Sequence, residues 1–293
     1  MASEKVFGIP KQSRALRLFD FLLYSHLWIA FAALALFWES QLLLSGQFSN
    51  APLAAFVFIA TLTLYNIHKI IGIRQTKNWV HQPRFRIAAF WRNYLQIIAA
   101  VGSISSSVLF YFLPPKVQLY IIVPTLIALA YAIPFLPGKR RLRDVHYIKI
   151  FLLVFVWLWV TVLLPVVDQR VIPGISVWLM SMGRLCFLFA LAIPFDIRDL
   201  QLDQANQVKT LPFFMGLRSA QRLSFYLLIL MLGCTWWNYE LHAYTLGDAL
   251  ALSISAILSG LAIRFATPEK SDYYFSGVLD GMMILQFVLI WLF

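Results

Sequence analysis

Long apolar segments, each close to twenty residues and nearly free of charge, follow one another along almost the whole 293-residue chain. An α-helix needs about 20 apolar residues to cross the hydrocarbon core of a bilayer. The segments are residues 18–44, 53–71, 87–113, 117–135, 147–167, 175–195, 219–237, 246–265 and 273–293. The sequence therefore predicts an all-α, polytopic membrane protein with about nine transmembrane helices.

Composition supports a single integral domain spanning residues 1–293. Hydrophobic residues make up 61% of the chain and charged residues only 13%, whereas soluble domains are typically about half apolar. The basic N-terminal segment precedes an apolar run that is too long for a cleavable signal peptide, so we expect the first helix there. Cys186 and Cys234 each lie inside an apolar span, which indicates neither a disulfide framework nor a cysteine-based metal site.

The basic residues indicate how the chain is oriented in the membrane. The net charge of +11 comes from short clusters between apolar spans, so it does not favour nucleic acid as a partner. Positive charge is retained on the cytoplasmic side during insertion. One side carries Lys5, Lys11, Arg14, Arg17, Arg74, Lys77, Arg84, Arg86, Lys139, Arg140, Arg141, Arg143, Arg198, Lys209, Arg218, Arg222, Arg264 and Lys270, and the other only Lys116 and Arg170. We therefore expect a cytoplasmic N-terminus, cytoplasmic loops at about 72–86, 136–146 and 196–218, and residence in a bacterial inner (plasma) membrane.

Three aspartates at the end of the sixth span are the clearest candidates for chemistry. Asp196, Asp199 and Asp203 follow an i, i+3, i+7 spacing, which places them on one face of a helix. Clustered carboxylates near a membrane repel one another and so require a counter-cation. Hard oxygen ligands favour Mg²⁺, commonly together with substrate phosphates. The alternative is a solvated loop face whose acids pair with Arg198 and Lys209.

The same segment resembles a known motif. Residues 196–203 have the pattern D-x-x-D-x-x-x-D and are followed by K-T-L-P at 209–212 and by Gly216. This is similar to the second aspartate motif of the UbiA superfamily of intramembrane prenyltransferases, and the number of spans and the position of the motif agree as well. The resemblance implies a helical bundle around a central cavity, open to the cytoplasm and laterally to lipid. It also implies that Asp196, Asp199 and Asp203 bind Mg²⁺ and act in catalysis. The partners would be a polyprenyl diphosphate and a hydrophobic acceptor, aromatic or lipid.

A basic loop after the fourth span is a second point of resemblance. The segment from Tyr131 to Arg143 is similar to the family's Tyr and Lys/Arg segment, and its clustered cations can neutralise a diphosphate. An equally simple explanation is that the cluster only fixes membrane orientation. The candidate diphosphate ligands among the basic residues are Lys139, Arg140, Arg143, Arg198 and Lys209.

The first aspartate motif of the family is degenerate in this chain. The family pattern N-D-x-x-D-x-x-x-D is represented only by Asn66, while Ile67, Ile70 and Arg74 stand in place of the aspartates. Lys69 lies at i+3 from Asn66, so both can face one cavity. In one interpretation, Lys69 and also Arg74 replace a metal and touch the diphosphate directly, while Asp196, Asp199 and Asp203 hold the one remaining Mg²⁺. Asn66 and Lys69 are then the substrate-binding candidates of this helix. In the other, the chain only binds isoprenoid or lipid.

Two further residues within the spans have open roles. Arg184 lies well inside the sixth span. An intramembrane charge is a candidate functional residue, but paired with a buried polar group it would be structural. His68 lies roughly opposite Asn66 on the helical wheel, so we expect it to serve packing or to lie at the interface.

A transporter stays an alternative class of protein, although the prolines of this chain mostly mark helix ends rather than broken helices.

Overall fold

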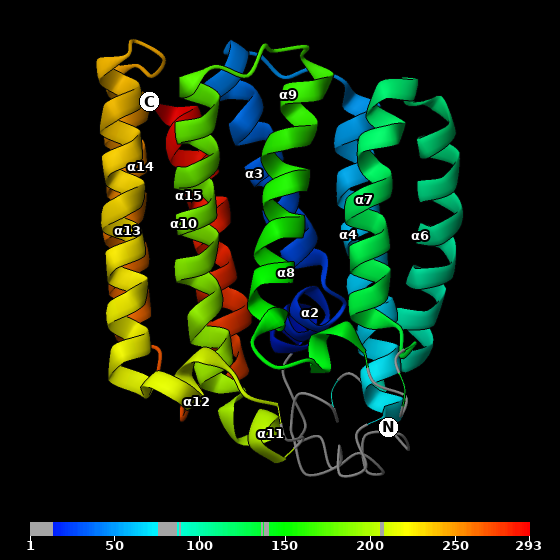
Figure 1. Cartoon of the computed structure of the whole chain (residues 1–293). Coiled ribbons are helices and arrows are strands. Elements are labelled where there is room, and N and C mark those ends of the chain that lie inside the picture. Colours follow the sequence, from blue (N-terminus) through cyan, green and yellow to red (C-terminus); the bar gives the residue numbers. More distant parts are fainter. Residues whose placement is uncertain (1–13, 76–86, 88, 136, 138–140, 206–207) are drawn as a thin grey trace.

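The computed structural model describes residues 14–75, 87, 89–135, 137, 141–205 and 208–293. In these ranges, eight helical segments are long and apolar enough to cross a membrane. A further helix, α13 (Leu217–Glu240), has 24 residues and runs beside α14 over the height of the bundle (Figure 1). The predicted all-α membrane bundle with about nine spans is therefore confirmed.

The observed helices follow the apolar segments of the sequence closely. Their bounds are α2 (Arg14–Tyr24), α3 (Leu27–Ser45), α4 (Ala51–Gln75), α6 (Arg92–Phe112), α7 (Pro115–Ala132), a 3₁₀ turn η3 (Leu142–Asp144), α8 (Ile148–Leu158), a π-helical turn η4 (Trp159–Leu163), α9 (Leu164–Asp168), α10 (Ile175–Arg198), α11 (Leu200–Ala205), α12 (Leu211–Met215), α13 (Leu217–Glu240), α14 (Leu246–Arg264), a π-helical turn η5 (Tyr274–Leu279) and α15 (Asp280–Leu292).

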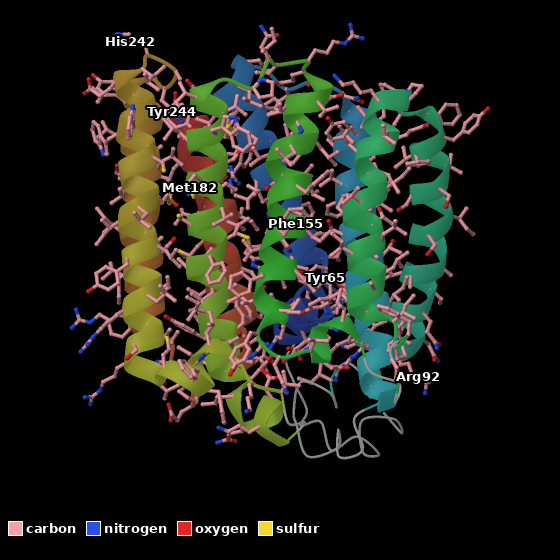
Figure 2. The ribbon with its side chains drawn as sticks, viewed as in Figure 1. Tyr65, Arg92, Phe155, Met182, His242 and Tyr244 are labelled. Atoms are coloured by element: carbon pink, nitrogen blue, oxygen red, sulfur yellow. The ribbon has the colours of Figure 1, made fainter. Side chains whose placement is uncertain are left out.

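The helices form a closed ring. Each helix contacts the next in the order α3, α4, α7, α8, α10, α13, α14 and α15, and α15 contacts α3 again. Helix α6 packs on α4 outside this ring. The outward side of the ring is apolar, and Figure 2 labels two of its exposed side chains, Met182 and Phe155. Polar side chains gather where α4 and α10 end and α8 begins, at the lower end of Figure 1. We call this the site end of the bundle.

The first span is broken rather than continuous. The sequence predicts one helix over residues 18–44, but α2 ends at Tyr24 and α3 begins at Leu27. Between them His26 has a left-handed backbone, with φ of 65°. The side-chain amide of Asn66 in α4 donates to the Ser25 carbonyl at 2.8 Å, so a carbonyl freed by the break has a partner. The expectation of one uninterrupted helix is therefore wrong because a tertiary contact stabilises the break.

An ion pair joins α3 to α10 in the half of the bundle away from the site end. Arg184 Nη2 lies 2.8 Å from Glu39 Oε1 and 3.3 Å from Ser40 Oγ. Both charged side chains are almost completely buried. Of the two roles open to Arg184, its pairing favours the structural one, because a buried charge is tolerated in a membrane interior when it has a partner.

Candidate functional site

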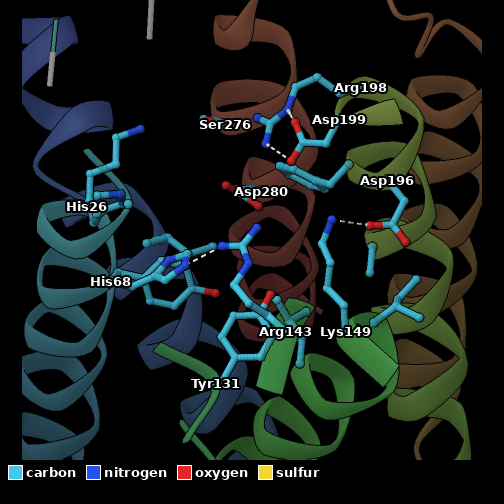
Figure 3. A pocket seen from close by; sticks show the side chains of 18 of the residues that line it. His26, His68, Tyr131, Arg143, Lys149, Asp196, Arg198, Asp199, Ser276 and Asp280 are labelled. Atoms are coloured by element: carbon cyan, nitrogen blue, oxygen red, sulfur yellow. Dashed lines mark hydrogen bonds and ion pairs between the residues drawn. The ribbon is translucent and has the colours of Figure 1, made fainter. Parts of the chain in front are cut away.

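A cavity of about 310 Å³ lies at the site end, inside the ring (Figure 3). Its walls come from α2, α3, α4, α7, η3, α8, α10, α11, η5 and α15. The wall is polar where these helices end and apolar toward the middle of the bundle, where Ile150, Leu153 and Leu191 line it. A cavity with this gradient suits a ligand with a charged head and an apolar tail.

The three predicted aspartates converge on this cavity. Asp196 lies in the last turn of α10, Asp199 at the junction that ends α10, and Asp203 in α11. Each is buried, and each lines the cavity. The helix is interrupted between them, but Asp203 N still donates to Asp199 O at 2.8 Å. The i, i+3, i+7 spacing therefore places all three carboxylates on one cavity despite the interruption.

Lys149, which the sequence analysis did not single out, lies at the centre of the acidic cluster. Its Nζ is 2.9 Å from Asp196 Oδ1 and 2.9 Å from Asp203 Oδ2. The side chain reaches the acids from the first turn of α8. The only signal in the sequence is a cation just inside an otherwise apolar span, and that signal does not reveal which residues the ammonium meets.

Arg198 is fixed by both acids and aromatic rings. Its Nε and Nη2 donate to the two carboxylate oxygens of Asp199, at 2.9 and 3.2 Å. Its Nη1 lies 3.5 Å from Asp272 Oδ1, just before η5. The guanidinium also lies over the rings of Phe195 and Phe275, at 5.1 and 5.4 Å. Such bidentate and stacked contacts hold a guanidinium in one orientation.

A second cation enters the cavity from the loop before α8. Arg143 contacts His68 Nε2 of α4 and lies over the Tyr131 ring at 5.5 Å. Arg143 lies within the turn η3, which is held by Arg141, whose side chain donates to both carboxylate oxygens of Asp144 at 3.1 and 3.0 Å. Burial acts to raise the pKa of Asp144, but the hydrogen bonds from Arg141 outweigh it and hold that pKa below its usual value. Asp144 therefore stays charged and orients the loop that presents Arg143.

The other predicted ligands divide into three groups. Lys69 and Arg143 line the cavity, as does Arg198. Lys209 is exposed and does not line it, although its backbone joins the start of α8, where Tyr147 N donates to Lys209 O at 3.0 Å. Lys139 and Arg140 lie outside the described residues.

Two residues of α4 differ from their expected placement. Asn66 is fully buried and is not among the residues that line the cavity, because its Nδ2 donates to the carbonyls of Ser25 and Leu62 at 2.8 and 2.7 Å. Its predicted role in substrate binding stays a prediction. His68, expected to serve packing or to lie at the interface, lines the cavity at the site end and contacts Arg143. The interruption of α2 and α3 opens space beside that face of α4, which a helical wheel does not reveal.

An apolar cavity of about 170 Å³ adjoins the charged one. It lies between α4, α7, α8 and η4, and it shares Tyr65, His68, Tyr131, Leu153 and Trp157 with the charged cavity. Trp157 Nε1 donates to the Tyr65 hydroxyl at 3.1 Å, so the two aromatic side chains at this junction are held together. The apolar chamber therefore lies directly beside the charged cavity, separated from it by these shared side chains.

Comparisons with known proteins identify the fold. No protein-family model matches the sequence, and no curated protein matches it. Among solved structures, a UbiA homolog from Archaeoglobus fulgidus bound to GPP and Mg²⁺ is 11% identical with a TM-score of 0.63, covering 92% of this chain and 99% of that one. A digeranylgeranylglyceryl phosphate synthase is 16% identical with a TM-score of 0.60, covering 93% of this chain and 96% of that one.

A further similar structure is the apo form of a UbiA homolog from Aeropyrum pernix K1. It is 15% identical, with a TM-score of 0.59, and the match covers 90% of this chain and 95% of that one. Similarity over nearly the full length of each chain means that the whole bundle is shared. The chain therefore has the UbiA fold, as the aspartate motif predicts.

The metal that this fold implies can be tested against the residues present. Structures of the Archaeoglobus homolog contain Mg²⁺ or Cd²⁺. Asp196, Asp199 and Asp203 supply the hard oxygens that Mg²⁺ prefers. In the described part of the chain, however, no three acidic, histidine or cysteine side chains are grouped so that they could hold a metal ion. Lys149 lies between Asp196 and Asp203, and Arg198 binds both carboxylate oxygens of Asp199. The donor set fits a divalent cation in its chemistry once these cations give up the carboxylates.

Proposed function

We propose that this protein transfers a prenyl group from a polyprenyl diphosphate to a hydrophobic acceptor, aromatic or lipid. The observation that carries the proposal is that the charged cavity and the apolar one adjoin and share lining residues, inside a membrane bundle of UbiA fold. The diphosphate would lie among Lys69, Arg143 and the acidic cluster, and the isoprenoid tail would extend past Trp157. The site would face the cytoplasm of a bacterial inner membrane, as the distribution of basic residues indicates.

Each part of the site has a role in such a reaction. Arg143 and Lys69 would bind phosphate oxygens as the bond between the prenyl C1 and the diphosphate breaks and its electron pair leaves with the diphosphate. The acceptor would form its new bond to C1 with its own electron pair and release one proton to solvent. A Mg²⁺ ion held by Asp196, Asp199 and Asp203 would supply further positive charge for the leaving group. The rings of Tyr65, Tyr131 and Trp157 present π faces that stabilise an allylic cation.

A second candidate function is isoprenoid binding without chemistry. It is favoured by Ile67 and Ile70, which stand where the related motif has aspartates and do not line the cavity. The ligand would be the same amphiphile, so the two functions differ only in whether diphosphate is released.

The deciding experiment is to measure diphosphate release by the purified protein in nanodiscs. Geranyl, farnesyl and longer prenyl diphosphates would be supplied with and without Mg²⁺, together with a membrane lipid extract as a source of acceptors. We expect Mg²⁺-dependent release that Asp196→Asn lowers at least about tenfold. Asp168→Asn, the same chemical change at the opposite end of the bundle, is the matched control. Saturable lipid binding with no release would support the binding function and overturn the transferase.

A further inference from the structure

The ammonium group of Lys149 lies between two carboxylates, at a point where a metal ion could also bind. Its ammonium nitrogen is 2.9 Å from one oxygen of Asp196 and 2.9 Å from one oxygen of Asp203, and all three side chains are largely buried. A Mg²⁺ ion bridging the same two oxygens would need oxygen distances of about 2.1 Å. The ammonium and the ion therefore cannot occupy this point together.

The formal charges around the cavity show what each ligand must bring. Among the residues that the structure describes, six carboxylates and five cationic side chains line the cavity: Asp144, Asp196, Asp199, Asp203, Asp272 and Asp280, and Lys69, Arg141, Arg143, Lys149 and Arg198. A diphosphate entering without a metal would bring its negative charge beside Asp196, Asp199 and Asp203 while Lys149 stays paired with two of these acids. A metal entering without a diphosphate would take the two carboxylates that hold Lys149, so its buried ammonium would lose both of these ion-pair partners. Each ligand therefore favours the binding of the other.

Of the two cations that contact the acidic motif, Lys149 is the one free to exchange partners. Arg198 has contacts to Asp199 and Asp272 and lies over two aromatic rings. Lysine has a flexible four-carbon stem, and its ammonium behaves as a point charge without a fixed fork. Lys149 can therefore turn within the cavity without any movement of α8.

We propose that Lys149 and a divalent cation are alternative occupants of the Asp196–Asp203 pair, and that the displaced Lys149 becomes a ligand of the diphosphate. The inference rests on the proposed function for the identity of the diphosphate ligand. In the ligand-free protein Lys149 neutralises the two acids and suppresses metal binding. When metal and diphosphate arrive together, the phosphate oxygens replace the acids as partners of the ammonium.

The experiment is a Mn²⁺ titration followed by electron paramagnetic resonance, on purified protein in detergent. Wild type, Lys149→Met and Lys149→Gln would be compared with and without a thio analogue of farnesyl diphosphate that does not ionise. Without the analogue, both variants should bind Mn²⁺ at least about tenfold more tightly than wild type. The analogue should raise the Mn²⁺ affinity of wild type at least about tenfold, and that of the variants much less.

Lys270→Met is the matched control, because it removes the same charge near the site end from a lysine that stacks on Tyr274 and does not line the cavity. Unchanged Mn²⁺ affinity in both Lys149 variants would overturn the inference. Lys149→Gln keeps a hydrogen-bond donor beside the acids. If either variant unfolds without metal, its melting temperature is measured with increasing Mn²⁺. A rise larger than that of wild type reports the expected gain in Mn²⁺ affinity, and the absence of such a rise overturns the inference.

The outcomes separate this inference from the proposed function. The metal titration requires no turnover. Coupled binding of Mn²⁺ and the analogue through Lys149, with no release of diphosphate from any substrate, would keep the inference and reject the transferase. Release of diphosphate, together with a Mn²⁺ affinity that does not depend on Lys149, would keep the transferase and reject the inference.

Discussion

Asn66 connects two parts of the molecule that are 41 residues apart in the chain. Its Nδ2 donates to Ser25 O, where the first span is broken, and to Leu62 O in its own helix. Its Oδ1 lies 3.5 Å from His26 Nδ1, and His26 lines the charged cavity. One asparagine therefore fixes the backbone that presents a cavity residue, without lining the cavity itself.

We predict that Asn66→Ala lowers the thermal stability of the protein and not only its affinity for a ligand. Loss of the amide leaves a buried carbonyl unpaired, which costs about 1–3 kcal/mol. The measurement is the thermal unfolding midpoint in detergent, with the exposed Asn93→Ala as the matched control. A variant with an unchanged midpoint but lost diphosphate binding would instead support Asn66 as a substrate ligand.

The candidate site was predictable from sequence only where its residues belong to one local pattern. Asp196, Asp199 and Asp203 are close in the chain, so their spacing was enough to predict that they converge. Lys149 meets them because α8 packs beside α10, and a single cation near the start of a span is also what membrane orientation predicts. Its role required the tertiary contact.

At the scale of elements, the apolar cavity is made by α7 packing against α4 and the α8–η4 segment. Ala128 of α7 lines this cavity, whereas Ala130, two residues away, does not. Small residues at such positions leave space for the tail of a ligand. The π-helical turn η4 contributes Val160 and Thr161 to the same wall, and π-helical turns often occur at functional sites.

We predict that Ala128→Phe shortens the prenyl chain that the protein accepts. A phenyl ring would fill much of a cavity of about 170 Å³, so long tails lose their space while short ones still reach the acids. The measurement is binding of geranyl against longer prenyl diphosphates, with Ala130→Phe as the control. An equal loss for all chain lengths would show that the apolar cavity does not hold the tail.

The ends of the helices were predictable because they depend on local physics. Residues 175–195 were expected as the sixth span, and α10 covers Ile175–Arg198, since apolar length alone determines where a helix leaves the bilayer. The break between α2 and α3 was not predictable. It contains neither glycine nor proline, and its left-handed His26 is stabilised by Asn66 from another helix.

At the scale of the whole molecule, an odd number of spans carries the chain from one membrane face to the other. In Figure 1, α2 lies at the site end and the chain finishes with α15 at the opposite end. This arrangement agrees with the nine segments of the sequence. The direction of insertion stays a prediction from the basic residues.

We predict that the site end faces the cytoplasm. Alkaline phosphatase fused after Phe293 should be active, because this enzyme folds only after export from the cytoplasm. Green fluorescent protein at the same position should be dark, because its chromophore does not form after export. Fusions within the loop before η3 should give the opposite pair of results. Fluorescence from a fusion after Phe293 would reverse the assigned orientation.

The half of the bundle away from the site end, which holds the Glu39–Arg184 pair, has an electrical consequence. Between the cavity and the Glu39–Arg184 pair, the fully buried Leu36 of α3 and Phe187 of α10 leave a packed, low-dielectric layer. In an energised membrane the voltage would fall mainly across this layer rather than across the cavity. Moving one charge through 100 mV costs about 2.3 kcal/mol, but an anionic head group bound at the site end would cross only a small part of that drop. Loading of such a ligand should therefore be nearly insensitive to the membrane potential.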